Sequence, residues 1–261
     1  MGQLDLVEVS HTYHSKRGET LALKDINLQV NEGQFFGIVG PSGSGKTTLL
    51  SIMAGVLVPS KGRVLLNGAP VQAGKVGYML QRDQLFEWRT IWRNVLLGLE
   101  IAKNKTPDSV AHAEELLRKY GLWEFRSRYP GELSGGMRQR AALIRTLVLK
   151  PQIVLLDEPF SALDFQTRIS VAEDVHAIIK NEGLTAVLVT HDISEAISLC
   201  DRIAVVTARP ATIKSIFEVS IDGNSLERRE NPQYAAMFKR IWKELDVYAE
   251  DNVFNRTPSV S

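Results

Sequence analysis

The most chemically specific stretch of the sequence lies at residues 40–47, which read GPSGSGKT and follow the short apolar run QFFGIV. Glycines at 43 and 45 let the backbone curl with several N–H groups pointing inward, as the binding of a dense anion requires. A helix that begins near Lys46 adds the positive end of its dipole. Lys46 supplies a mobile charge for the β and γ phosphates, and Thr47 supplies a hydroxyl for Mg²⁺. A glycine-rich turn without a ligand is the alternative, but the strand before and the helix after this phosphate loop favour a nucleotide site made by Gly40, Pro41, Ser42, Gly43, Ser44, Gly45, Lys46, Thr47 and Thr48.

A second candidate lies at residues 153–158, IVLLDE, where a hydrophobic strand ends in two acids. Ligands gather at the carboxyl ends of the strands of a parallel sheet, so this strand should end beside the phosphate loop. Asp157 is then placed to hold Mg²⁺ through water, and Glu158 can polarise an attacking water. Solvated acids at a strand end are the alternative, and the phosphate loop upstream favours a hydrolytic site.

Residues 133–140 read LSGGMRQR, which resembles the signature of the ABC ATPases, with Met137 where the family usually has glutamine. The resemblance implies that the signature loop, Ser134, Gly135 and Gly136, reaches the γ-phosphate of an ATP held by another subunit. It therefore implies a head-to-tail homodimer that closes on two ATP molecules. A serine that only caps a helix would explain the helix start, but not the matches elsewhere in the chain.

Those matches follow in the order of the family. Gln81 resembles the glutamine that is implied to touch Mg²⁺, so the implied metal set is Thr47, Gln81 and Asp157. Residues 161–164, SALD, resemble the D-loop, and His191 resembles the switch histidine that contacts the γ-phosphate. The implied catalytic set is Lys46, Glu158 and His191. Tyr13 resembles the aromatic residue that stacks on adenine, although the nearby Phe35 and Phe36 are alternatives.

The pattern of elements supports the fold that this resemblance implies, an α/β P-loop NTPase with a mostly parallel core sheet. Strands expected near 34–39, 76–80, 152–156, 185–189 and 202–206 alternate with helices expected at 46–54, 166–181 and 192–199. Residues 4–9 and 26–30 alternate as antiparallel strands do. A helical insert is expected at about 85–150, with helices near 108–120 and 134–149. The ABC domain would span 1–230, and 231–261 would hold an amphipathic helix at 233–248 and a frayed tail.

Composition limits the classes that fit. The net charge of +1 over 261 residues gives no support for nucleic acid as a partner. The single cysteine, Cys200, excludes an internal disulfide and is expected in the core. No apolar run approaches the roughly 18 residues that span a bilayer. If the protein works at a membrane, another chain must supply the spanning helices, and this one would lie peripherally on the cytoplasmic face.

A finer resemblance covers YPGELSGGMRQRAALIRTL and DEPFSALD, which are similar to importer ATPases for nitrate, sulfonate, taurine and pyrimidine precursors. It implies integral membrane permease subunits as partners and, indirectly, an extracytoplasmic solute-binding protein. Leu85, Phe86, Trp88 and Trp92 could form a groove for a permease helix, or could pack inside the insert. Three alternatives differ in class: a soluble ABC protein of DNA repair or translation, an exporter ATPase, and a non-catalytic regulatory cassette.

Overall fold

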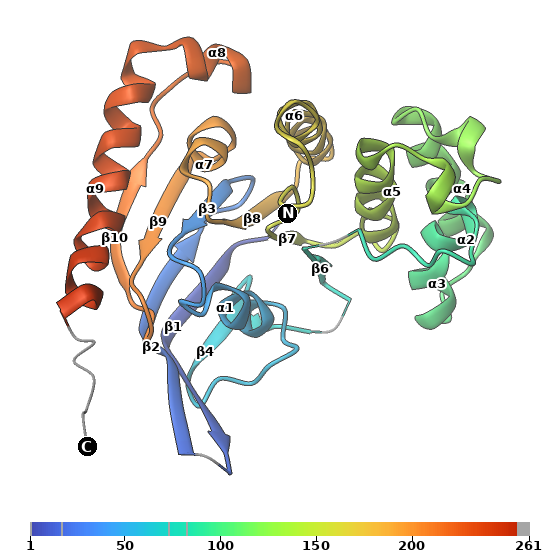
Figure 1. Cartoon of the computed structure of the whole chain (residues 1–261). Helices are drawn as coiled ribbons and strands as arrows, with labels where there is room; N and C mark the ends of the chain where they lie inside the picture. The colour runs from blue at the N-terminus through green and yellow to red at the C-terminus, as the bar shows by residue number, and fades with distance from the viewer. Residues whose placement is uncertain (1, 17, 73, 82, 255–261) are drawn as a thin grey trace, which may run out of the picture.

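The central element is a six-stranded sheet with the strand order β10-β9-β3-β8-β7-β6 (Figure 1). The computed structural model describes residues 2–16, 18–72, 74–81 and 83–254. In it, the strands from β9 to β6 run parallel, and β10 pairs antiparallel with β9. The mostly parallel sheet predicted from the sequence is therefore confirmed, and its strands are β3 (Phe35–Val39), β6 (Val76–Met79), β7 (Ile153–Asp157), β8 (Thr185–Thr190), β9 (Arg202–Val206) and β10 (Ile213–Glu218).

A second, antiparallel sheet has the order β2-β1-β4-β5. Its strands are β1 (Leu4–Ser15), β2 (Gly18–Val30), β4 (Lys61–Leu66) and β5 (Ala69–Pro70). The hairpin of β1 and β2 is much longer than the predicted strands at 4–9 and 26–30. Its register shifts between Leu6 and Val9 and again up to Thr12. Each shift changes which side chains face the interior, so a strict alternation cannot be followed past residue 9.

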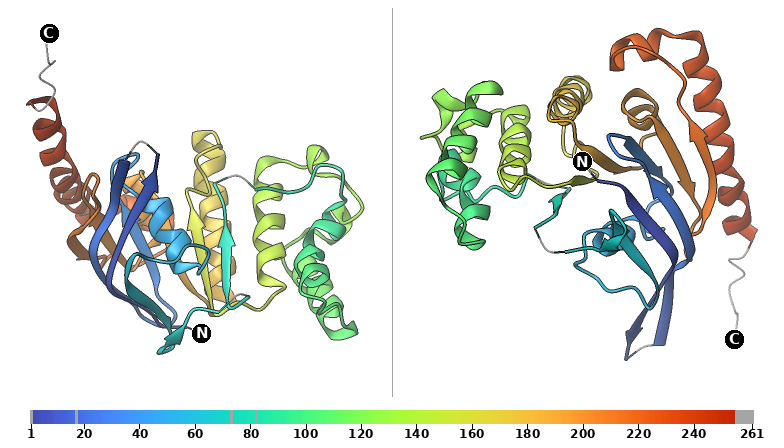
Figure 2. Two further views of the ribbon diagram at one scale, coloured as in Figure 1. Left: turned by 90° about the horizontal axis from the view of Figure 1, so that it is seen from below. Right: turned by 180° about the vertical axis from the view of Figure 1, so that it is seen from behind.

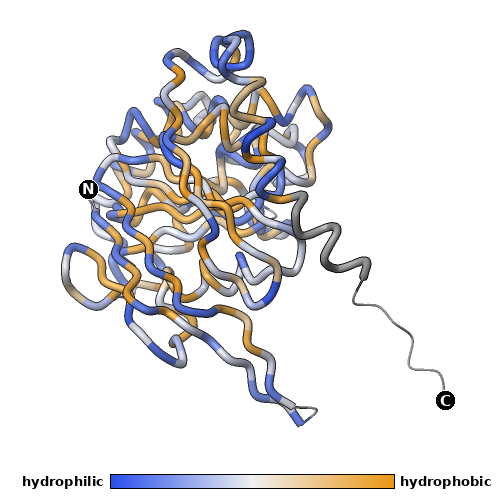
Figure 3. The backbone as a smooth tube through the Cα atoms, turned by 90° about the vertical axis from the view of Figure 1, so that its left-hand side faces the viewer, coloured by the Kyte–Doolittle hydropathy of each residue, from blue (hydrophilic) through white to orange (hydrophobic). Residues whose placement is uncertain are grey.

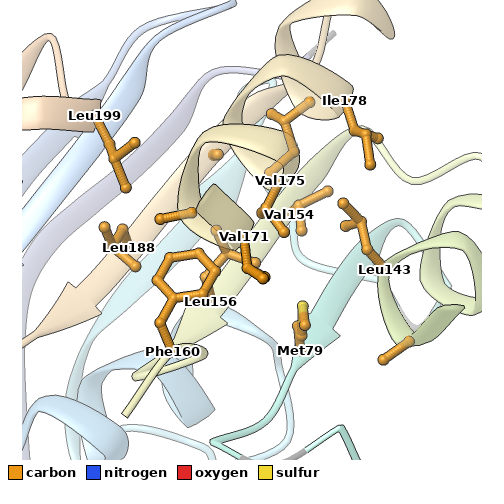
Figure 4. Packing of buried hydrophobic residues seen from close by; sticks show 14 of the residues in the cluster. Met79, Leu143, Val154, Leu156, Phe160, Val171, Val175, Ile178, Leu188 and Leu199 are labelled. Carbon is orange, nitrogen blue, oxygen red and sulfur yellow. The ribbon is translucent and has the colours of Figure 1, made fainter. Parts of the chain in front are cut away.

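The core sheet separates two hydrophobic cores. Successive side chains of a strand point to opposite faces, and in β7 Val154 and Leu156 face one core while Ile153 and Leu155 face the other. Helices α6 (Phe165–Asn181) and α7 (Ile193–Leu199) cover the first face (Figure 4), whereas α1 (Lys46–Met53) and the antiparallel sheet cover the second. In Figure 3, where the backbone tube is coloured by hydropathy, the hydrophobic segments accordingly gather in the interior of the molecule. Cys200 lies fully buried in the first core, as expected.

The segment between β6 and β7 forms a group of helices at one side of the core sheet, opposite α9 (Figure 2). The cap residue Ser134 starts α5, and Thr106 and Ser109 form a capping box at the start of α4. The predicted helices at 108–120 and 134–149 are confirmed within two residues at each end. The elements are α2 (Ile91–Val95), α3 (Leu97–Ile101), α4 (Pro107–Lys119), the 3₁₀ turns η1 (Trp123–Phe125) and η2 (Pro130–Glu132), and α5 (Gly135–Leu147).

The C-terminal region packs against the first core through α8 (Ser225–Glu230) and α9 (Pro232–Phe254). Ile241 is fully buried, and Tyr234, Met237, Phe238 and Leu245 pack against the core. The expected apolar stripe is thus mostly a packing face, although Trp242 is 53% exposed. The expected frayed tail lies outside the described residues. Among the described helices, none is long and apolar enough to cross a bilayer.

The ring of His176 on α6 predicts a pH dependence of stability. It packs 5.0 Å from the Phe35 ring, and burial is the largest cause that lowers its pKa from 6.5 to about 4. The unfolded chain therefore binds the proton more readily, so this contribution to stability is complete above pH 6.5 and is lost as the pH falls toward 4. For a shift of this size, we expect about 2 kcal/mol less unfolding free energy at pH 5 than at pH 7. Urea unfolding at pH 5 and pH 7 measures this difference in unfolding free energy. The difference should be smaller in His176→Gln than in wild type, and equal to wild type in the exposed control His14→Gln. Equal differences in wild type and both variants would contradict the role given to His176.

Candidate active site

The phosphate loop joins the end of β3 to the start of α1, at the carboxyl edge of the parallel strands (Figure 1). Gly45 precedes α1 with φ of 115°, a conformation that side chains other than hydrogen rarely allow. A Cβ atom on Gly40 would lie 2.4 Å from Cγ2 of Val206, so the loop begins pressed against β9. The spacing of glycines in this motif thus reflects both a left-handed turn and a close approach to a neighbouring strand.

Lys46 lies at the start of α1 with only 5% of its surface exposed. Its Nζ donates to the carbonyl oxygens of Gly40 at 2.9 Å and Pro41 at 2.8 Å. Burial lowers the pKa of Lys46, while the nearby carboxylates of Glu158 and Asp157 raise it. The loop therefore holds one desolvated ammonium group above its own carbonyls, where an anion can approach.

Asp157 ends β7 directly beside the phosphate loop, as the sequence predicted from the parallel sheet. Its Oδ1 accepts from the Thr47 hydroxyl at 3.4 Å and its Oδ2 from the Tyr78 hydroxyl at 3.4 Å. Burial is the main reason that the pKa of Asp157 is raised. A hydroxyl, a carboxylate and the amide of Gln81 on the same cavity wall form the oxygen-rich donor set that suits Mg²⁺.

Glu158 and His191 follow the neighbouring strands β7 and β8 and contact each other. Glu158 lines the cavity, whereas His191 lies beside it, in the wall of a separate pocket that includes Phe238 and Trp242 of α9. The His191 Nδ1 lies 3.1 Å from Oε2 of Glu158. Glu158 has φ of 44°, which is uncommon for a side chain of this size, and its N–H donates to Val189 at 2.9 Å. Strain of this kind is retained where surrounding structure fixes it, often at active sites. The backbone turn directs this carboxylate away from the β7 core and toward the imidazole.

Most of the residues predicted within one chain converge on a cavity of about 300 Å³, and His191 lies next to it through its contact with Glu158. Tyr13 stands at its edge, where its hydroxyl lies 3.1 Å from Oγ1 of Thr48. Gly40, Pro41 and Ser44 belong to the loop without lining the cavity. The lining is formed by Ser42, Gly43, Gly45, Lys46, Thr47, Thr48, Gln81, Asp157, Glu158 and Arg209.

The signature loop is not part of this cavity. Ser134 is exposed and caps α5, its Oγ accepting from Met137 N at 3.3 Å. A Cβ on Gly135 would lie 2.9 Å from Leu163 Cδ2, and one on Gly136 would lie 2.7 Å from Val171 Cγ2. The loop is therefore braced against the D-loop and α6 of its own chain. It presents Ser134 to a surface separate from Lys46.

Comparison with known proteins decides the family. Residues 23–161 match the protein family described as "ABC transporter". The uncharacterized ABC transporter ATP-binding protein YtlC of Bacillus subtilis is 48% identical over 251 residues, 94% of this chain and 96% of that protein. This chain belongs to the ABC transporter family. The ABC ATPase described here binds ATP and couples its hydrolysis to transport.

Two further relatives place this ABC ATPase within the family. The taurine import ATP-binding protein TauB of Jannaschia sp. is 37% identical over 231 residues, 86% of this chain and 86% of that protein. The dimeric cassette MJ0796, solved in a post-hydrolysis state with ADP and phosphate bound, superposes with a TM-score of 0.68. It is 31% identical in sequence and matches 83% of this chain and 98% of that one.

The sequence did not reveal two contributors to the cavity of this ABC ATPase. Arg209 follows β9 and donates from Nη2 to the Gly43 carbonyl at 3.0 Å. Tyr78 on β6 donates to Asp157. Arg209 lies in no motif, and Tyr78 lies just before Gln81 but was given no role; its contact follows from the strand order, because β6 is the neighbour of β7. Arg209 lies in the loop after β9, and no sequence pattern indicates its contact with Gly43.

The predicted groove of this ABC ATPase needs one correction. Leu85 is 6% exposed and belongs to the first core, so it does not line a surface groove. Trp88 is 74% exposed, and its ring centroid lies 4.9 Å from that of Phe86. Trp88 and Trp92 line a pocket of about 540 Å³ together with Arg89, Arg93, Leu96, Glu100 and Lys105. Of the four residues predicted for the groove, Trp88 and Trp92 therefore line the pocket, whereas Leu85 is a core residue and Phe86 contacts the ring of Trp88.

Proposed function

We propose that this ABC ATPase binds Mg-ATP beside Lys46, pairs head to tail with a second copy, and energises import of a small solute through partner permease subunits. One observation carries the proposal. The cavity gathers the phosphate loop and two carboxylates, one of which contacts the switch histidine beside it, yet the signature loop faces elsewhere. A second copy can supply that loop to each cavity. The dimeric state of the MJ0796 cassette supports this arrangement.

The residues in and beside the cavity have separate roles in phosphoryl transfer. Lys46 and the loop N–H groups orient the phosphates, since this chemistry depends mainly on positioning and charge neutralisation. The Glu158 carboxylate accepts the proton of the attacking water. His191, held at 3.1 Å from Glu158 through one ring nitrogen, offers the other to the γ-phosphate. Thr47, Gln81 and Asp157 would hold Mg²⁺, which neutralises phosphate charge when bound. Tyr13 stacks on adenine.

Pairing of two copies converts ATP binding into movement. The γ-phosphate contacts the Ser134, Gly135 and Gly136 of the second copy only in the closed pair, so ATP favours closure by its differential affinity for that state. Hydrolysis removes those contacts and the pair reopens. Residues 1–230 form the ABC domain with its helical insert at about 85–150, and residues 231–261 form the C-terminal helix and tail.

The pocket around Trp88 and Trp92 is the docking site for a permease helix on the cytoplasmic face of the membrane. A helix seated in a groove is a common recognition mode, and the pocket offers two indole rings to an apolar helix face and the charges of Arg89, Arg93 and Lys105 to its polar edge. The pocket begins at Trp88, seven residues after Gln81, which lines the ATP cavity. Occupation of the pocket can therefore be linked to the state of the nucleotide through a short stretch of chain.

Replacing Trp88 with alanine tests the transport part of the proposal. We expect Trp88→Ala to shift the ABC ATPase from the membrane fraction to the supernatant when it is co-expressed with its permease, because an exposed aromatic anchor contributes about 2 kcal/mol or more to such an interface. Turnover of the purified protein should change by less than about twofold. Trp242→Ala on α9 is the matched control. Retention of the Trp88→Ala protein on membranes would remove the pocket from this role.

The solute is a small molecule of the nitrate, sulfonate, taurine or pyrimidine-precursor class. The similarity to TauB of Jannaschia sp., named for taurine import, supports this choice. An extracytoplasmic solute-binding protein would deliver the solute to the permease and would not touch this chain. The cavity beside Lys46 binds ATP and not the solute.

A further inference from the structure

Arg168, in the first turn of α6, joins two loops that serve different parts of the proposed cycle. Its Nη2 donates to the Leu163 carbonyl at 3.0 Å, in the D-loop. Its Nη1 lies 3.7 Å from Oδ2 of Asp192, the residue after the switch histidine. The side chain is 26% exposed, so solvent screens this pair only in part.

The D-loop end of this contact leads to the signature loop. The Leu163 side chain lies so close to Gly135 that a Cβ there would come within 2.9 Å of it. Asp164 fixes the same loop as the cap of α6, accepting from the Thr167 N–H at 3.0 Å. A shift of the signature loop must therefore displace Leu163 and the carbonyl that Arg168 holds.

The Asp192 end leads to the hydrolytic groups. Asp192 caps α7 by accepting from the Ser194 N–H at 2.7 Å and the Glu195 N–H at 3.3 Å. Its own N–H donates to Thr190 Oγ1 at 3.0 Å. His191, between these anchored residues, reaches Glu158 at 3.1 Å. The position of the imidazole thus depends on where Asp192 is held.

We propose that Arg168 is a positioning residue that couples the two ATP sites of the pair, an inference that rests on the function proposed above. In the proposed pair, the signature loop of one chain faces the partner's ATP, whereas His191 and Glu158 of that chain face its own. Arg168 connects the two sets within one chain. ATP that engages the signature loop of a chain thereby helps to place the switch histidine of the same chain, and the two sites become cooperative.

Arginine suits this position because its planar fork presents two donors in fixed directions. Lysine carries the same charge on a single nitrogen, so it would have to meet Asp192 and the Leu163 carbonyl from one point instead of from two. Arg168→Lys therefore separates charge from geometry. Asp192→Asn keeps an acceptor for the α7 cap while removing the charge that faces Arg168.

The matched control is Lys180→Gln. Lys180 on α6 donates from Nζ to the Gly33 carbonyl at 3.3 Å and lies 3.0 Å from Oδ2 of Asp201, and its side chain is 37% exposed. Like Arg168, it joins a backbone carbonyl to a carboxylate from the same helix. Neither Lys180 nor its partners belong to the signature motif, the D-loop or the switch-histidine segment. Any general cost of removing a cation from α6 should appear in both variants.

The experiment measures steady-state ATP hydrolysis against ATP concentration for the full-length chain, together with binding of a fluorescent ATP analogue. Wild type should show a Hill coefficient between one and two, the limit for two sites. Arg168→Gln and Arg168→Lys should bring it to about one and lower the maximal rate about tenfold. Analogue binding and the melting temperature should match those of Lys180→Gln, which keeps the wild-type Hill coefficient.

The outcomes separate the inference from the proposed function. Cooperative turnover in Arg168→Gln equal to that of wild type would overturn the coupling role while leaving the ATPase assignment in place, and so would non-cooperative turnover in wild type. Absence of any ATP turnover in wild type would instead overturn the proposed function. If Arg168→Gln does not fold, Arg168→Lys and Asp192→Asn decide, and a double-mutant cycle between the two positions should give non-additive losses of cooperativity.

Discussion

Glu158→Gln is expected to lower ATP turnover by about 10²–10⁴-fold, the range that a positioned general base contributes. Glutamine keeps the size and hydrogen-bonding shape of the side chain but cannot accept a proton from the attacking water. The backbone at φ of 44° should tolerate the exchange, since neither residue is β-branched. Binding of ATP should stay within about twofold of wild type, because the phosphate loop around Lys46 is unchanged. The closed pair, which reopens only after hydrolysis, should then accumulate.

Two measurements on purified protein check this result. Phosphate release reports turnover, and size-exclusion chromatography with Mg-ATP reports the stable pair. Glu8→Gln is the matched control, because Glu8 also has a positive φ, of 52°, but lies on the exposed face of β1. Near-normal turnover in Glu158→Gln would remove Glu158 from its role as the base. Loss of analogue binding would mean instead that the substitution had disturbed the cavity.

Motifs with a fixed chemical purpose could be located from the sequence, and the strand order explains why. The phosphate loop follows β3, Asp157 ends β7 and His191 follows β8, and these strands are neighbours in the sheet. Once the strands are taken as parallel, their carboxyl ends must meet. The convergence of these residues at one edge of the sheet could therefore be predicted without knowledge of side-chain contacts.

Features set by tertiary contact could not be located in this way. The edge strand β10 has a mixed burial pattern with no fully buried residue, so its sequence carries a weak alternation. The burial of Leu85 depends on helices that arrive later in the chain. Arg209 and Arg168 act through carbonyl oxygens at 3.0 Å, and any residue type supplies such an acceptor. Their partners Gly43 and Leu163 lie in motifs, but a backbone carbonyl does not indicate which side chain will bind it.

Lys46→Ala is expected to weaken ATP binding by about 10–150-fold, which corresponds to the 1.5–3 kcal/mol of a hydrogen bond made by a charged group. The loss should fall on binding rather than on folding. Burial disfavours the ammonium, as its lowered pKa shows, so its removal relieves a desolvation cost while two loop carbonyls lose one donor. These opposing effects should leave the melting temperature nearly unchanged.

Lys46→Met separates the charge from the aliphatic stem, which packs at the start of α1. Equal loss of affinity in the alanine and methionine variants would assign the effect to the ammonium. As the pH rises, the Lys46 ammonium loses its proton and the ATP affinity of the wild type should fall. Because the pKa of Lys46 is lowered, this fall should begin at a lower pH than for a lysine with the ordinary pKa. Lys46→Met should lack this dependence. An ATP affinity of Lys46→Ala within about twofold of wild type would contradict the assignment of Lys46 and the phosphate loop as the triphosphate site. The mechanism of the paired chains depends on that assignment.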